Sequence, residues 1–132
     1  KAAEAKPFFE ISHDAYRNSV RLEPNSLRQR NDLCVVLLYN VKRDVEYAKK
    51  TLIACVAESG AALEDPEGDE QAIQDLNETV GDCYENLGYY YMTFGKDPAK
   101  ARKNLEKSLT FWPFKRRRGV SFLRQLDSEP KK

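Results

Sequence analysis

The side chains with most capacity for chemistry in this sequence are three cysteines, Cys34, Cys55 and Cys83, and a single histidine, His13. A zinc site usually takes four nitrogen or sulfur ligands that occur in closely spaced pairs. The cysteines are far apart and form no C-x-x-C pair, so the sequence predicts no metal site and no cofactor. A catalytic Cys–His pair would need His13, which lies among helix-forming residues without a supporting motif. We expect three buried thiols in a reducing compartment, such as the cytoplasm.

Carboxylates are the other candidates for catalysis, because paired acids can exchange protons with a substrate. Nine acidic residues and no basic one lie between Glu64 and Glu85. Solvation explains such a run more simply than catalysis does. The sequence also shows neither a nucleophile–base pair nor a glycine-rich phosphate loop. It therefore predicts a protein that is not an enzyme and has no catalytic residues.

A basic run, Lys115-Arg116-Arg117-Arg118, is the third chemical feature. Such clusters can contact nucleic-acid phosphates or anionic headgroups. Lysine and arginine also neutralise the carbonyl end of a neighbouring helix, or dock an acidic segment of a second molecule. The net charge is only +1 and no RNA-binding signature accompanies the run. Nucleic-acid or anionic-surface binding is therefore an alternative function, and nucleic acid is not the favoured partner.

The elements that must position these groups are predicted to be helices, because apolar residues recur at the 3.6-residue period and no segment is typical of a strand. Ser26, Asp44 and Asp97 are expected to cap three of them. Pro66 and Gly68 mark a turn over residues 64–69, and a last helix is expected over 115–126. The expected apolar faces are Phe8, Ile11, Ala15, Ser19 and Leu22; Leu27, Asn31, Cys34, Val35 and Leu38; Val45, Ala48, Leu52, Cys55, Val56 and Leu63; Ile73, Leu76, Val80, Cys83, Leu87, Tyr91 and Phe94; Ala101, Leu105, Ser108, Leu109 and Trp112.

The 132 residues, of which 41% are apolar, suffice for one all-α domain. No apolar run approaches the roughly 20 residues that a membrane helix needs, so no membrane span is expected. The chain starts at Lys1 without a signal-peptide pattern. We interpret it as a fragment or a processed form that lacks its native N-terminus and any targeting signal.

An internal repeat relates residues 31–56 to residues 84–109 without a gap, so that Asp44, Ala48 and Leu52 match Asp97, Ala101 and Leu105. The segment from Tyr84 to Pro113 resembles a tetratricopeptide repeat, with one extra residue in the turn near Lys96. The matching positions are Leu87-Gly88, Tyr91, Gly95, Ala101, Leu105, Ser108 and Pro113. The middle copy departs from the pattern, with Cys34-Val35 in place of Leu-Gly and no proline at its end.

The resemblance implies a short right-handed superhelix of stacked helix hairpins, an α-solenoid of about two and a half repeats. Its parts would be a half repeat at 1–24, a repeat at 26–63, the acidic turn 64–69, a repeat at 70–113, a capping helix at 115–126 and a tail at 127–132. The helices joined by the acidic turn are overlong and would project as an antiparallel pair that carries most of the acidic run. An uncovered apolar end would make self-association an alternative.

In that family the concave groove binds an extended peptide or a partner helix, which implies a non-enzymatic scaffold for protein–protein interaction. The corresponding groove residues here are Asp32, Val36, Tyr39, Asn40, Asp82, Glu85, Asn86, Tyr89 and Met92. One subtype of the family clamps chaperone carboxylates with Lys, Asn and Arg. Of its positions here, only Asn86 fits and Asp82 would repel a carboxylate, so a neutral or basic protein segment is the expected partner.

Three consecutive tyrosines, Tyr89-Tyr90-Tyr91, span about 200° of a helix and cannot all be in the core. Tyr91 is expected to be a packing residue. Tyr89 or Tyr90 must then face a groove or another chain, where exposed tyrosine is enriched, or fill a gap between helices. The sequence does not decide between these two interpretations.

Overall fold

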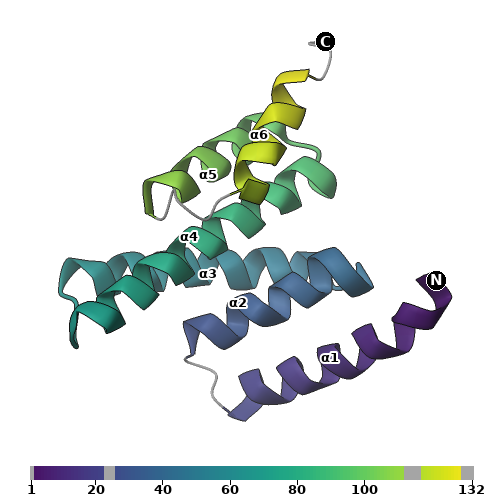
Figure 1. Ribbon diagram of the computed structural model, residues 1–132, viewed down its shortest axis with the longest axis horizontal. Coiled ribbons are helices and arrows are strands. Elements are labelled where there is room, and N and C mark those ends of the chain that lie inside the picture. Colours follow the sequence, from purple (N-terminus) through teal and green to yellow (C-terminus); the bar gives the residue numbers. More distant parts are fainter. Residues whose placement is uncertain (1, 23–25, 112–116, 129–132) are drawn as a thin grey trace.

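The computed structural model describes residues 2–22, 26–111 and 117–128, and every element in these ranges is helical (Figure 1). In chain order the elements are α1 (Ala2–Leu22), α2 (Leu27–Val35), η1 (Val36–Val41), α3 (Val45–Glu64), α4 (Glu70–Thr93), α5 (Pro98–Phe111) and α6 (Arg117–Ser128). The predicted all-α class is confirmed. None of the described helices has an apolar stretch long enough to cross a lipid bilayer.

Polar side chains set the start of three helices. Ser26 Oγ accepts the backbone N–H of Gln29 at 3.3 Å, which confirms its predicted role as the cap of α2. Asp97 accepts the backbone N–H three residues later at 3.1 Å before α5, and Asp69 does the same at 2.9 Å before α4. Pro98 occupies the first turn of α5, where its missing N–H leaves no bond unmade.

Asp44 precedes α3 as expected, but the prediction that its side chain caps the helix is wrong. Its backbone is left-handed, with φ 54°, and the side chain makes no capping hydrogen bond. The carboxylate instead lies 3.9 Å from the guanidinium of Arg17 on α1. Only the carbonyl of Asp44 serves the helix, by accepting the N–H of Ala48 at 3.0 Å.

Helix α2 does not continue regularly, because η1 follows it as a wider π-helical segment. Its first three residues, Val36, Leu37 and Leu38, are buried, and it ends at Lys42 in the left-handed region with φ 53°. The periodicity of the sequence predicts an ordinary helix here. Segments of π-helix are often found at functional sites, and this one carries three of the predicted groove residues, Val36, Tyr39 and Asn40.

Successive helices pack against each other along the chain, as the ribbon shows (Figure 1). Two further contacts skip one helix: α2 packs against α4, and α4 against α6. Helix α4 thereby contacts α2, α3, α5 and α6, and its packing is the most extensive of any element among the described residues. It is the central helix of the molecule.

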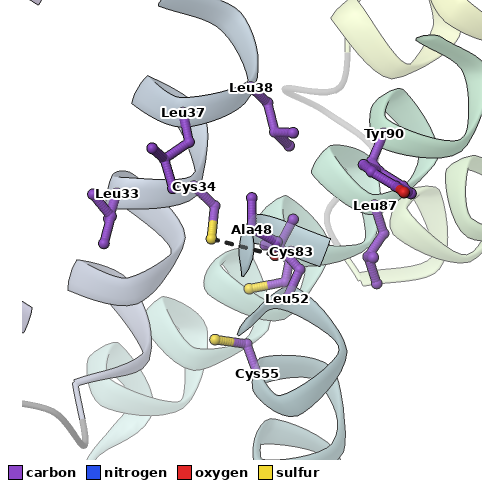
Figure 2. Close-up of a cluster of buried hydrophobic side chains, with 10 residues drawn as sticks. All are labelled: Leu33, Cys34, Leu37, Leu38, Ala48, Leu52, Cys55, Cys83, Leu87 and Tyr90. Atoms are coloured by element: carbon purple, nitrogen blue, oxygen red, sulfur yellow. Dashed lines mark hydrogen bonds between the residues drawn. The ribbon is translucent and has the colours of Figure 1, made fainter. Parts of the chain in front are cut away.

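The core lies where α2, η1, α3 and α4 meet, and the predicted apolar stripes supply all but three of its residues, Leu33, Leu37 and Tyr90. Its buried residues are Leu33, Cys34, Leu37, Leu38, Ala48, Leu52, Cys55, Cys83, Leu87 and Tyr90 (Figure 2). The packing tyrosine is Tyr90 and not Tyr91 as expected, because Tyr90 is buried and Tyr91 only partly so. The three thiols are free and buried, as expected. Cys34 Sγ lies 3.6 Å from the carbonyl oxygen of Ala48, and the thiols of Cys55 and Cys83 hydrogen-bond to each other.

The apolar face predicted for residues 1–24 is not buried. Phe8, Ile11 and Leu22 are 71%, 66% and 72% exposed, and α1 uses another face for its contacts with α2 and η1. That face brings Tyr16 and Val20 against the core. Among the described residues α1 packs with one side only, and the predicted apolar stripe lies on its other side.

Polar contacts fix which side of α1 faces inward. Arg43, just before α3, donates to both carboxylate oxygens of Glu10 at 2.8 Å. The same guanidinium lies 3.2 Å from Nδ1 of the buried His13. A fork-shaped donor that meets a carboxylate in this way fixes orientation as well as adding energy. These three residues hold α1 against the turn that precedes α3.

The close approach of α4 and α5 can be tested at Gly88. A Cβ at this position would lie 2.5 Å from Cγ of Leu105 and 3.2 Å from the carbonyl oxygen of Ala101. We expect Gly88→Ala to lower the free energy of unfolding by about 1–3 kcal/mol, as overpacked cores do. Gly60→Ala is the matched control, since nothing lies within 4 Å of that position in α3. Urea unfolding should show it about 0.5–1 kcal/mol more stable; equal effects would contradict the close approach.

The buried thiols predict a pH dependence of stability. Burial raises the pKa of Cys34 well above the ordinary thiol value of about 9. Above about pH 9 the unfolded chain loses the thiol proton that the folded chain keeps. The contribution of this thiol to the free energy of unfolding is therefore fully present below about pH 9 and is lost as the pH rises above it. Each such thiol contributes a slope of at most about 1.4 kcal/mol per pH unit. Urea unfolding at pH 8–10 under reductant should give Cys34→Ala a shallower decline; an unchanged slope would contradict this.

Candidate functional site

The residues predicted to line a groove lie on α2, η1 and α4, which pack against each other. Asp32, Tyr39, Asn40, Asp82, Tyr89 and Met92 are half-buried, and Val36, Glu85 and Asn86 are buried. The structure therefore divides the predicted set into side chains at the surface and side chains inside the helix interfaces. The sequence did not distinguish these two groups.

A buried polar network connects η1 and α2 to α4. Tyr39 Oη donates to Oδ1 of Asn86 at 3.2 Å, and Nδ2 of Asn86 donates to Oδ1 of Asn31 at 2.9 Å. Burial raises the pKa of Tyr39, which keeps its hydroxyl protonated and able to donate. A satisfied buried network of this kind specifies one arrangement of the helices. Asn86 thus holds two helices together and is not accessible to a ligand.

Aromatic rings extend from this network toward α6. The rings of Tyr39 and Tyr89 stack with their centroids 4.0 Å apart and 20° between their planes. The ring of Phe122, on α6, lies 5.2 Å from that of Tyr89. Of the three consecutive tyrosines, Tyr90 is the most buried and hydrogen-bonds to Glu46 of α3. Tyr89 is the tyrosine that faces other elements on the groove side.

A buried carboxylate of α4, that of Glu85, contacts the first turn of α6. Glu85 Oε1 accepts the backbone N–H of Gly119 at 3.1 Å, and Oε2 lies 3.2–3.3 Å from the guanidinium nitrogens of Arg118. That guanidinium also lies over the ring of Tyr39, 4.5 Å from its centroid. The first N–H groups of a helix have no partner within it, and an acidic side chain there is stabilising. Glu85 therefore anchors α6.

A second charged cluster lies where α2 meets α4. Arg28 donates to Asp82 at 2.7 Å and to the hydroxyl of Thr79 at 2.9 Å, and it lies 3.7 Å from Asp32. Burial raises the pKa of Asp32, although the nearby guanidinium of Arg28 acts in the opposite direction. A half-buried carboxylate with incomplete compensation is a good acceptor for a further cationic donor.

An open pocket of about 300 Å³ lies next to Asp32. It is lined by Ser12 and Tyr16 from α1 and by Asp32, Val35, Val36 and Asn40 from α2 and η1. Its lining residues thus combine two valines with one carboxylate, one amide and two hydroxyl groups. A pocket of this size and composition can hold one or two side chains of a bound protein segment.

The structure places the predicted basic patch only in part. Arg117 is exposed at the start of α6, and Arg118 is engaged with Glu85 and Tyr39. Lys115 and Arg116 lie outside the described residues, as do Pro113 and Trp112. Within the described ranges, no group of three or more His, Cys, Asp or Glu side chains could hold a metal ion.

Sequence reasoning missed the residues that other elements bring to this region. Ser12 and Tyr16 line the open pocket, and Gly119 and Phe122 contact Glu85 and Tyr89 of the predicted set. Only the spacing of Arg118 and Phe122, four residues apart on one helix face, could have signalled a shared role. Nothing local indicates that Glu85 is their partner, 33 residues away from Arg118.

No protein-family model matches this chain, and no curated protein or solved structure matches it either. The function of this chain is therefore inferred from the geometry of the site.

Removal of the Glu85 carboxylate tests its role as the anchor of α6. We expect Glu85→Ala to leave the Gly119 N–H and the Arg118 guanidinium without their acceptor, at a cost of about 1–3 kcal/mol in unfolding free energy. Hydrogen exchange should accelerate first in α6. Glu106→Ala is the control, because its exposed carboxylate is 3.9 Å from Arg102 and such pairs contribute about 0–1 kcal/mol. Unchanged exchange in α6 would show that Glu85 does not anchor it.

Proposed function

We propose that this chain is a tetratricopeptide-like helical-repeat module that binds a protein segment and catalyses no reaction. The packing of α2 with α3, α4 with α5, and α2 with α4 supports this proposal, because stacked hairpins share their core in this order. In this proposal α1 is the second helix of a preceding half repeat. Helix α6 follows the last repeat as a cap.

The observation that carries the proposal is the open pocket between α1 and α2–η1. It lies at predicted groove positions, Asp32, Val36 and Asn40, and it combines apolar wall with convergent polar groups. Among its described lining residues the one acidic side chain, Asp32, retains partial exposure at 32%. A protein segment with a Lys or Arg next to a small apolar residue matches this lining, which agrees with a neutral or basic partner.

Selection from a displayed library of linear peptides tests this function. Peptides that bind the full chain should be enriched in Lys or Arg. Asp32→Asn should weaken their binding about tenfold, or about 1.4 kcal/mol, because it removes one charge-assisted contact while keeping the side-chain shape. Tyr16→Ala should weaken it as well by enlarging the pocket.

Asp14→Asn is the matched control for this experiment, since Asp14 is on α1 with its side chain 76% exposed and does not line the pocket. It should bind the selected peptides as the unchanged chain does. Failure to enrich any peptide, or equal losses in Asp14→Asn and Asp32→Asn, would exclude this pocket as the binding site.

A further inference from the structure

The start of α6 contacts three of the predicted groove residues that do not line the open pocket. We name Tyr39, Glu85 and Tyr89 the docking face. Arg118 donates to the buried carboxylate of this face and lies over its first ring, the Gly119 N–H donates to the same carboxylate, and Phe122 packs on its second ring. The chain itself thus displays one ligand that fits this surface.

The chemistry of these contacts exceeds what a covering helix requires. Apolar side chains alone would shield a core, and α6 has half-buried ones in Val120, Leu123 and Leu126. The docking face adds a carboxylate that is 4% exposed, and a buried carboxylate is costly unless charged or N–H donors satisfy it. Whenever α6 leaves, this face therefore favours another donor of the same kind. A guanidinium suits it best, because it forks onto a carboxylate and also stacks on an aromatic ring.

The spacing along α6 defines the rest of the ligand. Arg118 and Phe122 are four residues apart, so they project from one side of the helix. The N–H of Gly119 belongs to the first turn, whose N–H groups have no acceptor within the helix. The docking face therefore fits a helix with an arginine in its first turn and an aromatic residue four positions later.

We propose that the docking face binds such a helix from a partner protein, and that α6 competes with it by occupying the same face. This inference rests on the proposed function and names the class of partner. Charge and shape complementarity support this occupant, because the face presents an acidic acceptor beside two stacked rings and α6 shows the matching Arg and Phe in place.

Competition has a measurable consequence. If the face is free for only a fraction of the time, the apparent dissociation constant of the partner is the intrinsic one divided by that fraction. A chain whose α6 is released about a tenth of the time therefore binds about tenfold more weakly than a chain whose α6 cannot dock. Mutations in α6 that break its contacts should strengthen binding in trans.

The probe for this experiment is a fluorescent peptide with the sequence of α6, residues 117–128, titrated with full-length chains. We expect it to bind the double variant Arg118→Ala/Phe122→Ala at least about tenfold more tightly than the unchanged chain. The same peptide with Ala in place of its Arg and Phe should bind neither chain. Arg117→Ala is the matched control, because it removes an equal charge from an exposed neighbour on the same helix turn.

Hydrogen exchange in α4 and α5 must show that the double variant stays folded; if it does not, Phe122→Ala alone takes its place. A second variant, Glu85→Gln, should lose the peptide in the α6-released background. Equal peptide binding by the unchanged and α6-released chains, or binding that survives Glu85→Gln, would overturn the inference. So would dimers that form by exchange of α6 between copies, detected by light scattering.

The outcome also separates this inference from the proposed function. Library peptides that depend on Asp32 but are unaffected by Arg118→Ala/Phe122→Ala would leave the open pocket as the binding site and remove the competition by α6. If peptide binding depends neither on Asp32 nor on Arg118 and Phe122, the proposed function itself is excluded.

Discussion

The fold depends on the ability of α4 to pack against four other helices at once. Each of its sides serves a different neighbour. Gly88 lets α5 approach, Cys83 and Leu87 enter the shared core with α2 and α3, and Glu85 meets α6. A helix used on all sides leaves little surface for solvent, which explains why α4 has polar residues such as Asn86 among its buried ones. Those polar residues must be satisfied by the neighbours that cover them.

The polar contacts of α4 accordingly do more than fill space. Hydrophobic packing alone tolerates small shifts of one helix along another, whereas hydrogen-bonded groups tolerate few. Asn86 fixes α2 and η1 through Asn31 and Tyr39, while Glu85 fixes the start of α6. The neighbouring surface is formed by the stacked rings of Tyr39 and Tyr89 and by the Arg118–Glu85 pair. Its geometry is therefore fixed by interactions inside the protein. A rigid surface of this kind is suited to recognition, because little ordering remains to be done when a ligand binds.

The features that the sequence predicted correctly are those encoded within a few residues. Ser26 and Asp97 cap the helices that follow them, and the periodic stripe through Val80, Cys83 and Leu87 is buried. The failures concern interactions between distant segments. The exposed stripe around Ile11 has a normal helical period, and only the tertiary position of α1 decides that its other side is packed.

The same reasoning explains what could be predicted of the candidate site. Three of the predicted groove positions, Asp32, Val36 and Asn40, line an open pocket. Their accessibility does not follow from the sequence, because the π-helical turn of η1 and the docking of α6 are decided by contacts far along the chain. In the sequence Glu85 is one of the nine acidic residues of the run over 64–85, and only its contact with Arg118 in the folded chain distinguishes it.

The folded structure changes the interpretation of the uneven charge distribution along the sequence. An acidic segment followed by a basic one predicts opposite surfaces for other molecules. In the folded chain members of the two segments meet, since Arg118 pairs with Glu85, and the earlier Arg28 pairs with Asp82. These pairs neutralise part of the asymmetry within the molecule, where Coulomb attraction is screened less than in water. In the competition proposed for α6, the charges that decide recognition are those of Glu85 and Arg118, because an arginine of the partner helix would replace Arg118.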